Sequence, residues 1–350
     1  MIISLILDPS VMNGESFQTI SGYRENVHTL FKGLAANGVL LDDSHGTLQR
    51  ELRQSIESLP PKYRQRLQGC FEELVKNKKQ RIIKMPAQAT RGGVRGTMTR
   101  LNELHPVDAL CVSEETLQSL GEPPPNALPV VEYAYSEVES LRERYLAEMP
   151  SLHELSMREV VDLWARAVRY CKWLRFYDKQ SGKGKNLKRF FQGIDFILGI
   201  WERYGVVPKE KPEVQIITST AHYIREDSSD YVAQQYIKEN KQAAEDIHRL
   251  LIRPLQKRYK HGEIGLRIKN VQPDLFHARY LHGQFLILNV ERGFDFIRGS
   301  EYRECLWCER RISCSDCSVD VGCAACLISL RKTDDAHLAR LWQLPDYPLP

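Results

Sequence analysis

Closely spaced cysteine pairs constrain this chain more than any other feature of its sequence. Three Cys-x2-Cys pairs follow one another over residues 305–326, with five residues between successive pairs. Two such pairs can place four thiolates around one tetrahedral ion and close a structural zinc site. The cysteines concerned are Cys305, Cys308, Cys314, Cys317, Cys323 and Cys326. Their spacing predicts a zinc knuckle that stabilises the fold and carries no chemistry of its own.

Six thiolates exceed the four that one zinc ion needs. One pair is spare, or two ions share bridging thiolates, or a histidine such as His282 or His337 completes a second site. An iron–sulfur cluster is the other metal-based interpretation. The remaining cysteines, Cys70, Cys111 and Cys171, lie apart from one another, which is typical of thiols in a hydrophobic core.

The first residues and the composition indicate the class of protein. The opening run MIISLIL is too short for a signal peptide or a membrane span, and we expect it to form a buried strand. We therefore expect a cytoplasmic protein without a transmembrane segment, whose reduced thiols bind metal. A chain of 350 residues with 42% hydrophobic and 27% charged residues favours two globular domains. Its net charge of +4 is mild, so any affinity for nucleic acid must come from local clusters.

Alternating strand and helix patterns predict two α/β domains, residues 1–149 and 150–350, divided after a charged helix near Pro150. In the first domain we expect strands at 2–7, 39–41, 80–84, 107–113 and 129–133, and helices at 17–35, 44–57 and 61–79. This alternation favours a mostly parallel sheet. In the second domain we expect strands at 173–178, 214–220, 264–269, 275–281 and 285–290, and helices ending near 172 and at 186–204, 229–259 and 335–343.

A histidine and an arginine stand close together in the predicted strand 275–281. The strand period of two puts His277 and Arg279 on one face. An imidazole beside a guanidinium suits a phosphate, because the imidazole can attack or protonate while the guanidinium holds two oxygens. A satisfied surface pair would show the same pattern.

Residues 173–297 resemble the phospholipase D-like fold in its single-motif branch, which includes the domain that follows microtubule-interacting and trafficking domains. The resemblance lies in WLRFYD, VQIITST and FHARYL followed by ERGFDFI. It implies that His277 is the family nucleophile and that Arg279 replaces the family lysine. Gln284 stands where active members carry an aspartate, and only one motif is present, so the resemblance favours phosphate binding over hydrolysis.

Other residues of this half bear on the same expectation. Glu291 and Asp295 flank the sheet edge and either orient Arg279 or cap a strand. Lys179, Lys183 and Lys185 precede a predicted helix N-terminus, where lysines and backbone N–H groups collect anions. A solvated loop is the alternative for these lysines.

Acidic residues mark the strand ends of the first domain. Asp8 follows the first strand, Asp42 and Asp43 end the second, Asp108 opens a later strand, and Glu114 and Glu115 close it. Carboxylates at the carboxyl edge of a parallel sheet converge where ligands and divalent ions bind. Helix capping would also place aspartates at strand ends.

Residues 1–135 weakly resemble PIN-like nuclease domains, which hold magnesium or manganese against a phosphodiester. By this resemblance Asp8 is a first metal ligand, with Asp108 and Glu114 or Glu115 as later ones, and Asp43 joins the candidate catalytic set. Arg91, Arg95 and Arg100 lie in a Gly- and Arg-rich segment that we expect to be a loop contacting nucleic acid.

Together these features predict a nucleic-acid-processing effector in which a Mg²⁺- or Mn²⁺-dependent nuclease is fused to a zinc-stapled phosphate-binding domain. Such fusions resemble prokaryotic anti-phage defence proteins, which implies nucleic acid, a protein sensor or ATPase, and possible homodimers as partners. Two alternatives stay open. One is a His277-dependent phospholipase D-type phosphodiesterase, and the other is a non-catalytic adaptor that binds nucleic acid or phosphate.

Overall fold

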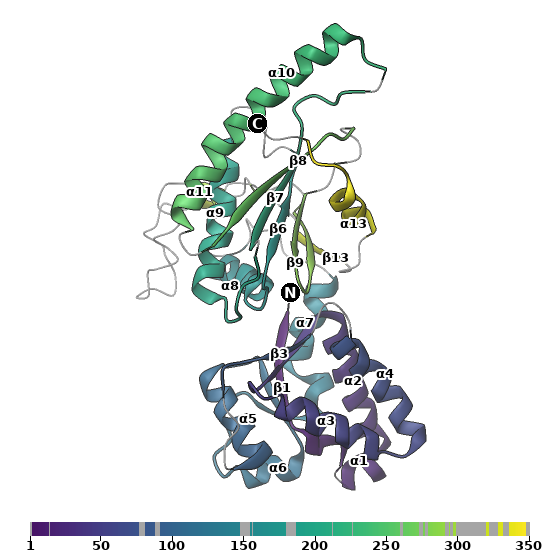
Figure 1. The fold of residues 1–350 in the computed structure, drawn as a ribbon. Coiled ribbons are helices and arrows are strands. Elements are labelled where there is room, and N and C mark those ends of the chain that lie inside the picture. The colour runs from purple at the N-terminus through teal and green to yellow at the C-terminus, as the bar shows by residue number, and fades with distance from the viewer. Residues whose placement is uncertain are drawn as a thin grey trace. The chain divides into compact units, whose positions relative to one another are not determined.

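The protein divides into two compact units, Met1–Ala147 and Glu148–Pro350. The computed structural model describes residues 2–13, 15–76, 81–87, 92–147, 155, 157–179, 187–211, 213–225, 227–259, 262–272, 276, 279–290, 294, 297–298, 320–321, 328–331 and 336–347. Each unit is described by itself below, and in each one a sheet forms the centre (Figure 1).

The first unit is built on a parallel sheet of five strands. These are β1 (Ile3–Leu7), β2 (Gly38–Asp42), β3 (Ile82–Lys84), β4 (Ala109–Val112) and β5 (Ala127–Pro129), in the spatial order β3-β2-β1-β4-β5. Every residue of β1, β2 and β4 is buried, as expected for strands covered on both faces by helices. The predicted α/β class with a mostly parallel sheet is confirmed for this unit.

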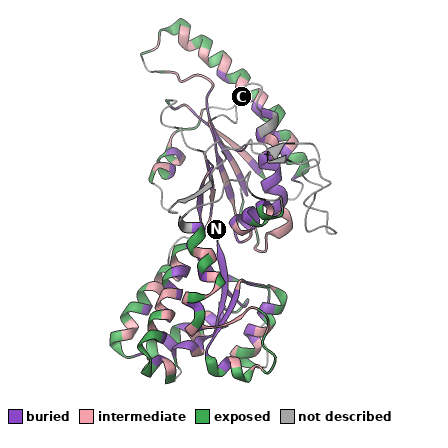
Figure 2. Ribbon diagram, turned by 180° about the vertical axis from the view of Figure 1, so that it is seen from behind, coloured by how far each residue is buried: buried purple, intermediate pink, exposed green. Residues whose placement is uncertain are grey.

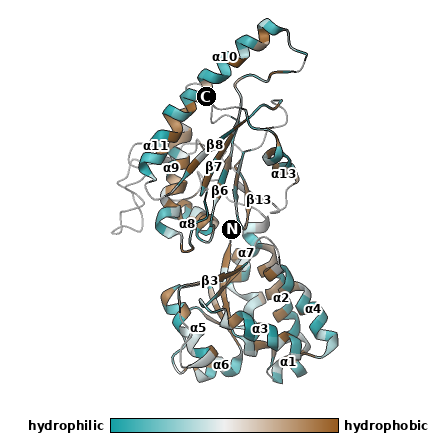
Figure 3. Cartoon of the chain, in the orientation of Figure 1, coloured by the Kyte–Doolittle hydropathy of each residue, from teal (hydrophilic) through white to brown (hydrophobic). Residues whose placement is uncertain are grey.

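Helices cover this sheet. They are α1 (Glu15–Thr19), α2 (Ser21–Asn37), α3 (Thr47–Ser58), α4 (Pro61–Lys76), α5 (Gly93–Leu104), α6 (Glu114–Ser119) and α7 (Glu137–Ala147), with 3-10 turns η1 (Pro9–Met12) and η2 (Val130–Tyr135). Apolar side chains of α2, α3 and α4 pack with those of β1 and β2 into one core. Figure 3 shows this core as brown strands beneath helices that are teal on their outer sides.

Two sequence predictions for this unit are wrong in their local structure. The Gly- and Arg-rich segment predicted as a loop is mostly helix α5, because Thr97, Met98 and Leu101 form a buried face at helical spacing. The strand predicted at 129–133 is instead the end of β5 followed by η2. There Val130 and Tyr133 are buried three residues apart, which matches a 3-10 turn and not an alternating strand.

The second unit holds a mixed sheet of six strands. These are β6 (Leu174–Tyr177), β7 (Val214–Ser219), β8 (Ile264–Lys269), β9 (Tyr280–Gly283), β10 (Ile287–Val290) and β13 (Ile328–Arg331), in the order β13-β10-β9-β6-β7-β8. Strands β6, β7 and β8 run parallel, whereas β9, β10 and β13 pair antiparallel. A short pair, β11 (Ile297–Arg298) and β12 (Asp320–Val321), is separate from this sheet.

The helices of the second unit lie on both faces of its sheet. They are α8 (Met157–Val168), α9 (Leu187–Tyr204), α10 (Asp230–Ile247), the π turn η5 (His248–Ile252), α11 (Arg253–Arg258) and α13 (Ala336–Gln343). Figure 1 shows α8, α9 and α11 on one side of the sheet and α13 on the other. In Figure 2, α9 is largely buried while α10 is exposed along much of its length.

Two predictions for the second unit need correction. The helix predicted as continuous over 229–259 contains the π turn η5 between α10 and α11. The strand predicted at 275–281 begins only at Tyr280, so Arg279 lies directly before β9 and not within a strand. His277 lies outside the described residues, and the predicted shared face of His277 and Arg279 therefore stays a prediction.

Glycine at position 193 is required by close packing. A Cβ atom at Gly193, in α9, would collide with the main-chain carbonyl of Phe294, whereas one at Gly69, in α4, would meet nothing within 4 Å. Alanine normally stabilises a helix relative to glycine by about 1 kcal/mol. We expect Gly69→Ala to raise the free energy of unfolding by up to that amount. Gly193→Ala should lower it by about 2 kcal/mol, because overpacking costs more than helix propensity returns. Urea denaturation followed by circular dichroism measures both, and equal stabilities for the two variants would contradict the packing.

Candidate functional site

The carboxyl edge of the first sheet is the place where its topology gathers polar side chains. Strand order reverses on either side of β1, which makes the ends of β1 and β4 the switch point where open α/β sheets bind ligands. The register that pairs Leu5 with Leu40 brings Asp8 and Asp43, the residues that follow β1 and β2, to the same level. The predicted meeting of these two residues at one edge agrees with the register.

Asp8 is held rigidly at this edge. Its backbone N–H donates to the Cys111 carbonyl at 2.9 Å, which continues the pairing of β1 with β4. Its carboxylate caps η1, accepting hydrogen bonds from the Ser10 amide at 2.9 Å and the Ser10 hydroxyl at 2.6 Å. Asp8 is only 3% exposed. One carboxylate thus both caps a turn and stands at the switch point.

A cluster of hydroxyl groups connects Asp8 to the start of α6. The Ser10 Oγ lies 3.2 Å from the Ser113 Oγ and 3.2 Å from the Thr116 Oγ1. Ser113 is the N-cap of α6, since its Oγ accepts from the Thr116 amide at 3.1 Å. The sequence analysis missed these hydroxyl residues, although a serine three residues before a threonine at a strand end is a capping signal.

Two further carboxylates lie at the start of α6, the helix that follows β4. Glu114 and Glu115 occupy the exposed first turn of α6, where negative charge is stabilised by the helix dipole. Their charges act on the phenol of Tyr23, which is buried on α2. Burial raises its pKa, and the negative charges of Glu115, Asp8 and Glu114 raise it further. All three carboxylates therefore lie within electrostatic reach of one phenol, a residue that the sequence analysis did not single out.

The two neighbouring aspartates after β2 have different roles. Asp42 accepts the amides of Asp43, Leu48 and Gln49 and so fixes the start of α3. Burial raises the pKa of Asp42, against the effect of these hydrogen bonds. Its neighbour Asp43 instead has one carboxylate oxygen without a hydrogen-bond partner among the described residues.

Asp43 is fully buried, yet only one of its oxygens is engaged. Oδ1 accepts the amides of His45 at 2.7 Å and Thr47 at 3.2 Å. Oδ2 is buried and has no hydrogen-bond partner among the described residues. Burial alone would raise the pKa of Asp43, but hydrogen bonds from Thr47, His45 and Gly46 outweigh it and lower the pKa. An ionised carboxylate with an unpartnered oxygen is suited to a cation.

Asp108 does not belong to this group, and its prediction as a co-ligand of Asp8 is wrong. It precedes β4 and accepts hydrogen bonds from the Ser4 amide at 2.8 Å and the Ser4 hydroxyl at 3.0 Å. Because β1 and β4 are parallel, Asp108 lies at the amino edge of the sheet. Ser4 and Asp8 are four positions apart along the strand, which is about 13 Å.

The predicted basic residues lie in different places. Arg95 and Arg100 are exposed on α5, and Arg100 pairs with Glu103 at 3.2 Å. Lys179 is the second residue after the end of β6. Arg91, Lys183 and Lys185 lie outside the described residues.

In the second unit, Arg279 contacts an acidic residue that the sequence analysis did not name. Asp178 directly follows β6 and is fully buried, and its Oδ1 lies 3.5 Å from the Arg279 Nε. Gln284 stands in the turn after β9, at the opposite end of that strand from Arg279. It therefore does not occupy a position beside Arg279. Glu291 and Asp295 lie outside the described residues.

The two histidines considered as zinc ligands contact aromatic rings. The His282 ring meets Trp173 edge-on at 5.0 Å, and the His337 ring meets Tyr280 at 6.4 Å. The six cysteines of 305–326 lie outside the described residues, so the zinc knuckle stays a prediction. Within the described ranges, no group of three or more histidine, cysteine, aspartate or glutamate side chains is arranged to hold one metal ion.

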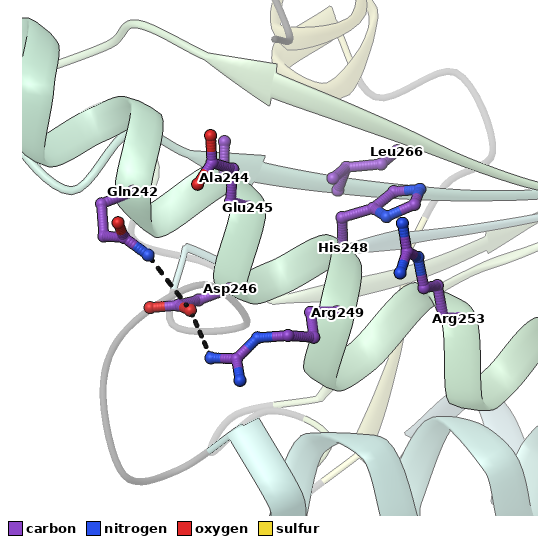
Figure 4. A pocket seen from close by; sticks show the side chains of 8 residues that line it. All are labelled: Gln242, Ala244, Glu245, Asp246, His248, Arg249, Arg253 and Leu266. Carbon is purple, nitrogen blue, oxygen red and sulfur yellow. Dashed lines mark hydrogen bonds and ion pairs between the residues drawn. The ribbon is translucent and has the colours of Figure 1, made fainter.

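A hollow of about 600 Å³ lies between the end of α10, η5 and the edge strand β8 (Figure 4). Asp246 accepts from Arg249 at 2.7 Å and from Gln242 at 3.4 Å. His248 and Arg253 lie side by side over Leu266 in Figure 4. The hollow combines acidic and basic groups, and we assign it no chemical step.

Comparison of the chain with protein-family models, with curated proteins and with solved structures finds no match. The resemblances to phospholipase D-like and PIN-like proteins therefore stay predictions. Among the helices in the described part of the chain, none combines the length and the apolar composition needed to cross a membrane.

The donors at the carboxyl edge fit a hard divalent cation. Mg²⁺ usually keeps several waters and takes only one or two protein carboxylates, so it does not require a preformed cage of three. Asp8, Asp43 and Glu114 or Glu115 offer such oxygens, and the buried Oδ2 of Asp43 is unpartnered within the described residues.

We expect Mn²⁺ to stabilise the first unit by binding at this edge. At a concentration about 100 times its Kd, a ligand that binds only the folded state adds about 2.7 kcal/mol. Thermal unfolding with and without Mn²⁺ should show this shift for the wild type and for Asp108→Asn, whose substituted residue lies at the other edge. Asp8→Asn and Asp43→Asn should reduce or abolish the shift. An undiminished shift in both of these variants would place any bound ion elsewhere.

Proposed function

We propose that the protein is a divalent-cation-dependent nuclease whose chemistry takes place at the carboxyl edge of the first sheet. The observation that carries the proposal is that Asp8 and Asp43 follow neighbouring parallel strands at the same level of the carboxyl edge, beside the topological switch point. Carboxylates near such a point are the usual means of holding Mg²⁺ or Mn²⁺ against a phosphodiester.

The protein groups have distinct parts in this proposal. Asp8 and Asp43 would hold the ion, and Glu114 or Glu115 would add negative charge beside it. When bound, the ion would supply an activated water and stabilise the leaving oxygen. Ser10 fixes the orientation of the Asp8 carboxylate through its amide and hydroxyl. The exposed guanidinium of Arg95 attracts the phosphate backbone.

The second unit would bind phosphate without cleaving it. Asp178 orients Arg279, and a guanidinium fixed in this way can hold two phosphate oxygens. We place the whole protein among prokaryotic defence effectors, which implies control of the nuclease by a sensor or ATPase partner. This last step is by analogy between folds.

The ion pair between Arg279 and Asp178 also supports a second candidate function. If His277 attacks the phosphate and Arg279 holds it, the protein is a phospholipase D-type phosphodiesterase that needs no metal. If neither unit reacts, the same contacts make it an adaptor for nucleic acid or phosphate. One assay separates the three possibilities.

We expect purified protein to cleave RNA or DNA with Mg²⁺ or Mn²⁺ and to lose activity in EDTA. Asp8→Asn should lower the rate by roughly 100-fold or more, as removal of a charge-stabilising group does. The matched control Asp108→Asn and the variant His277→Ala should keep activity. Single-stranded RNA, single-stranded DNA and duplex DNA are the substrates. Full activity in EDTA that is lost in His277→Ala would favour the phosphodiesterase, and no cleavage by any form would favour the adaptor.

A zinc knuckle would stabilise the second sheet by cross-linking the chain between β10 and β13. Val290 of β10 pairs with Ile328 of β13, so the chain leaves the sheet after one strand and returns at its neighbour with the cysteines between them. Metal that closes such a loop stabilises the folded state. We expect elemental analysis to find zinc. The double variant Cys305→Ser with Cys308→Ser should have a lower zinc content and a lower melting temperature, with a smaller effect on activity. Protein without zinc after gentle purification would contradict the site.

A further inference from the structure

One face of the second sheet gathers basic side chains that are far apart in the sequence. Residues Tyr177, Ile217 and Arg267 stand opposite one another in β6, β7 and β8, and therefore share a face. The strand period of two places Arg175 and Lys269 on this same face. We call Arg175, Arg267 and Lys269 the basic face.

The end of the chain covers the basic face. Helix α13 packs Leu338 and Leu341 against Tyr177 and Ile217 of the sheet. The last two residues of α13 and the four that follow it, residues 342–347, cross the end of β8, where the Tyr347 amide donates to the Ile268 carbonyl at 2.6 Å. We call residues 342–347 the cover segment.

A carboxylate of the cover segment sits on two of the basic side chains. Asp346 accepts from the Arg267 Nε with both of its oxygens, at 3.1 and 2.9 Å, and its Oδ2 lies 2.7 Å from the Arg267 Nη2. Its Oδ1 lies 2.7 Å from the Lys269 Nζ. Such a charge-assisted arrangement is the one that guanidinium and ammonium groups offer to a phosphate.

Lys269 takes its acceptors from the cover segment. Its side chain is fully buried, and its Nζ donates to the main-chain carbonyls of Trp342, at 3.3 Å, and Leu344, besides its ion pair with Asp346. An ammonium group has three N–H donors, and here they face three oxygens of one segment. A phosphodiester presents two terminal oxygens and can replace two of these three acceptors.

Positive charge exceeds negative charge on this face. Within the described part of the chain, Asp346 is the carboxylate that pairs with Arg267 and Lys269, and Arg175 contacts no carboxylate there. Burial lowers the pKa of the Arg175 guanidinium, Tyr177 opposes this effect, and the nearby charge of Arg267 adds to it. The two guanidinium groups therefore lie close enough to repel each other.

Aromatic rings alternate with these cations. The Arg175 guanidinium lies 4.3 Å from the Trp173 ring centroid and 3.7 Å from that of Trp342, and Arg267 lies 4.2 Å from the Trp342 ring. Trp342 thus lies against two guanidinium groups. A base can take the place of such a ring, because stacking and cation–π contact do not depend on base identity.

The cover segment can leave without unfolding the unit. Its anchor is the buried pair Leu338 and Leu341, which belongs to α13 and can stay in the core. Trp342 and Tyr347 are only partly buried, and Asp346 is 43% exposed. Release therefore exposes the half-buried side chains of Trp342 and Leu344, which pack against the core, and uncovers all three cations.

We propose that the basic face is a binding site for single-stranded nucleic acid and that the cover segment occupies it as an internal mimic, with Asp346 in place of a phosphate and Trp342 in place of a base. Phosphates bind Arg267 and Lys269, and a base stacks on Arg175 and Trp173. Binding of the strand and occupation of the basic face by the cover segment are mutually exclusive. The site is independent of cleavage by the first unit, because it needs no metal ion.

The test measures binding of a fluorescent 12-nucleotide single strand in EDTA by anisotropy. Asp346→Asn should bind the strand about tenfold more tightly than the wild type does. The weakened cover segment then occupies the basic face less often and reduces the apparent affinity less. The control Glu239→Gln makes the same change of charge on α10 and should match the wild type. Adding Arg175→Gln to Asp346→Asn should remove the gain. Equal gains in Asp346→Asn and Glu239→Gln, or a gain that survives Arg175→Gln, would overturn the site.

Two further measurements test the ligand class and the wild-type protein. The affinity for duplex DNA and for heparin should increase less in Asp346→Asn than the affinity for the single strand does. An equal increase would show that the basic face binds anions in general and would overturn the proposal. Hydrogen exchange of wild-type residues 342–347 should become faster when the single strand is bound, by reciprocity of the two equilibria. Unchanged or slower exchange would show that the strand does not displace the segment, whatever the variants do.

Discussion

Parallel pairing of β1 with β2 and β4 is the constraint on which the first unit depends. These strands are buried along their whole length, so both faces need helices and every connection must cross from one edge of the sheet to the other. As a result the chain emerges from β1, β2 and β4 at one common edge. The acidic residues that follow these strands are brought together by topology, before any ligand is considered.

The carboxylates at this edge also have structural roles. Asp8 caps η1 and Asp42 caps α3, which satisfies backbone N–H groups that would otherwise be unpaired. Capping and ligand binding therefore do not exclude each other. A carboxylate that caps a helix is already oriented and loses little conformational entropy when a cation binds. Asp42 differs, because its pKa is raised and its oxygens already accept three amide hydrogen bonds.

Much of the fold could be predicted from the sequence, because burial patterns and strand–helix alternation are local. The site was predictable only where a residue follows a strand, as Asp8 and Asp43 do. Asp108 was misplaced because it opens its strand, and a parallel sheet sends strand starts and strand ends to opposite edges. Tyr23 and the hydroxyl cluster were missed because their proximity depends on how α2 and α6 pack, which no local pattern records.

The basic face shows the same limit more strongly. Arg175, Arg267 and Lys269 look like isolated charges in sequence, and only the register of β6, β7 and β8 assembles them. A fully buried ammonium group is costly unless oxygens surround it, so the position of Lys269 demands a partner. Asp346 and two carbonyls supply that partner from within the chain. The first unit thus gathers carboxylates that attract a cation, whereas the second gathers cations that attract an anion. A phosphodiester chain with its metal ion presents both kinds of charge.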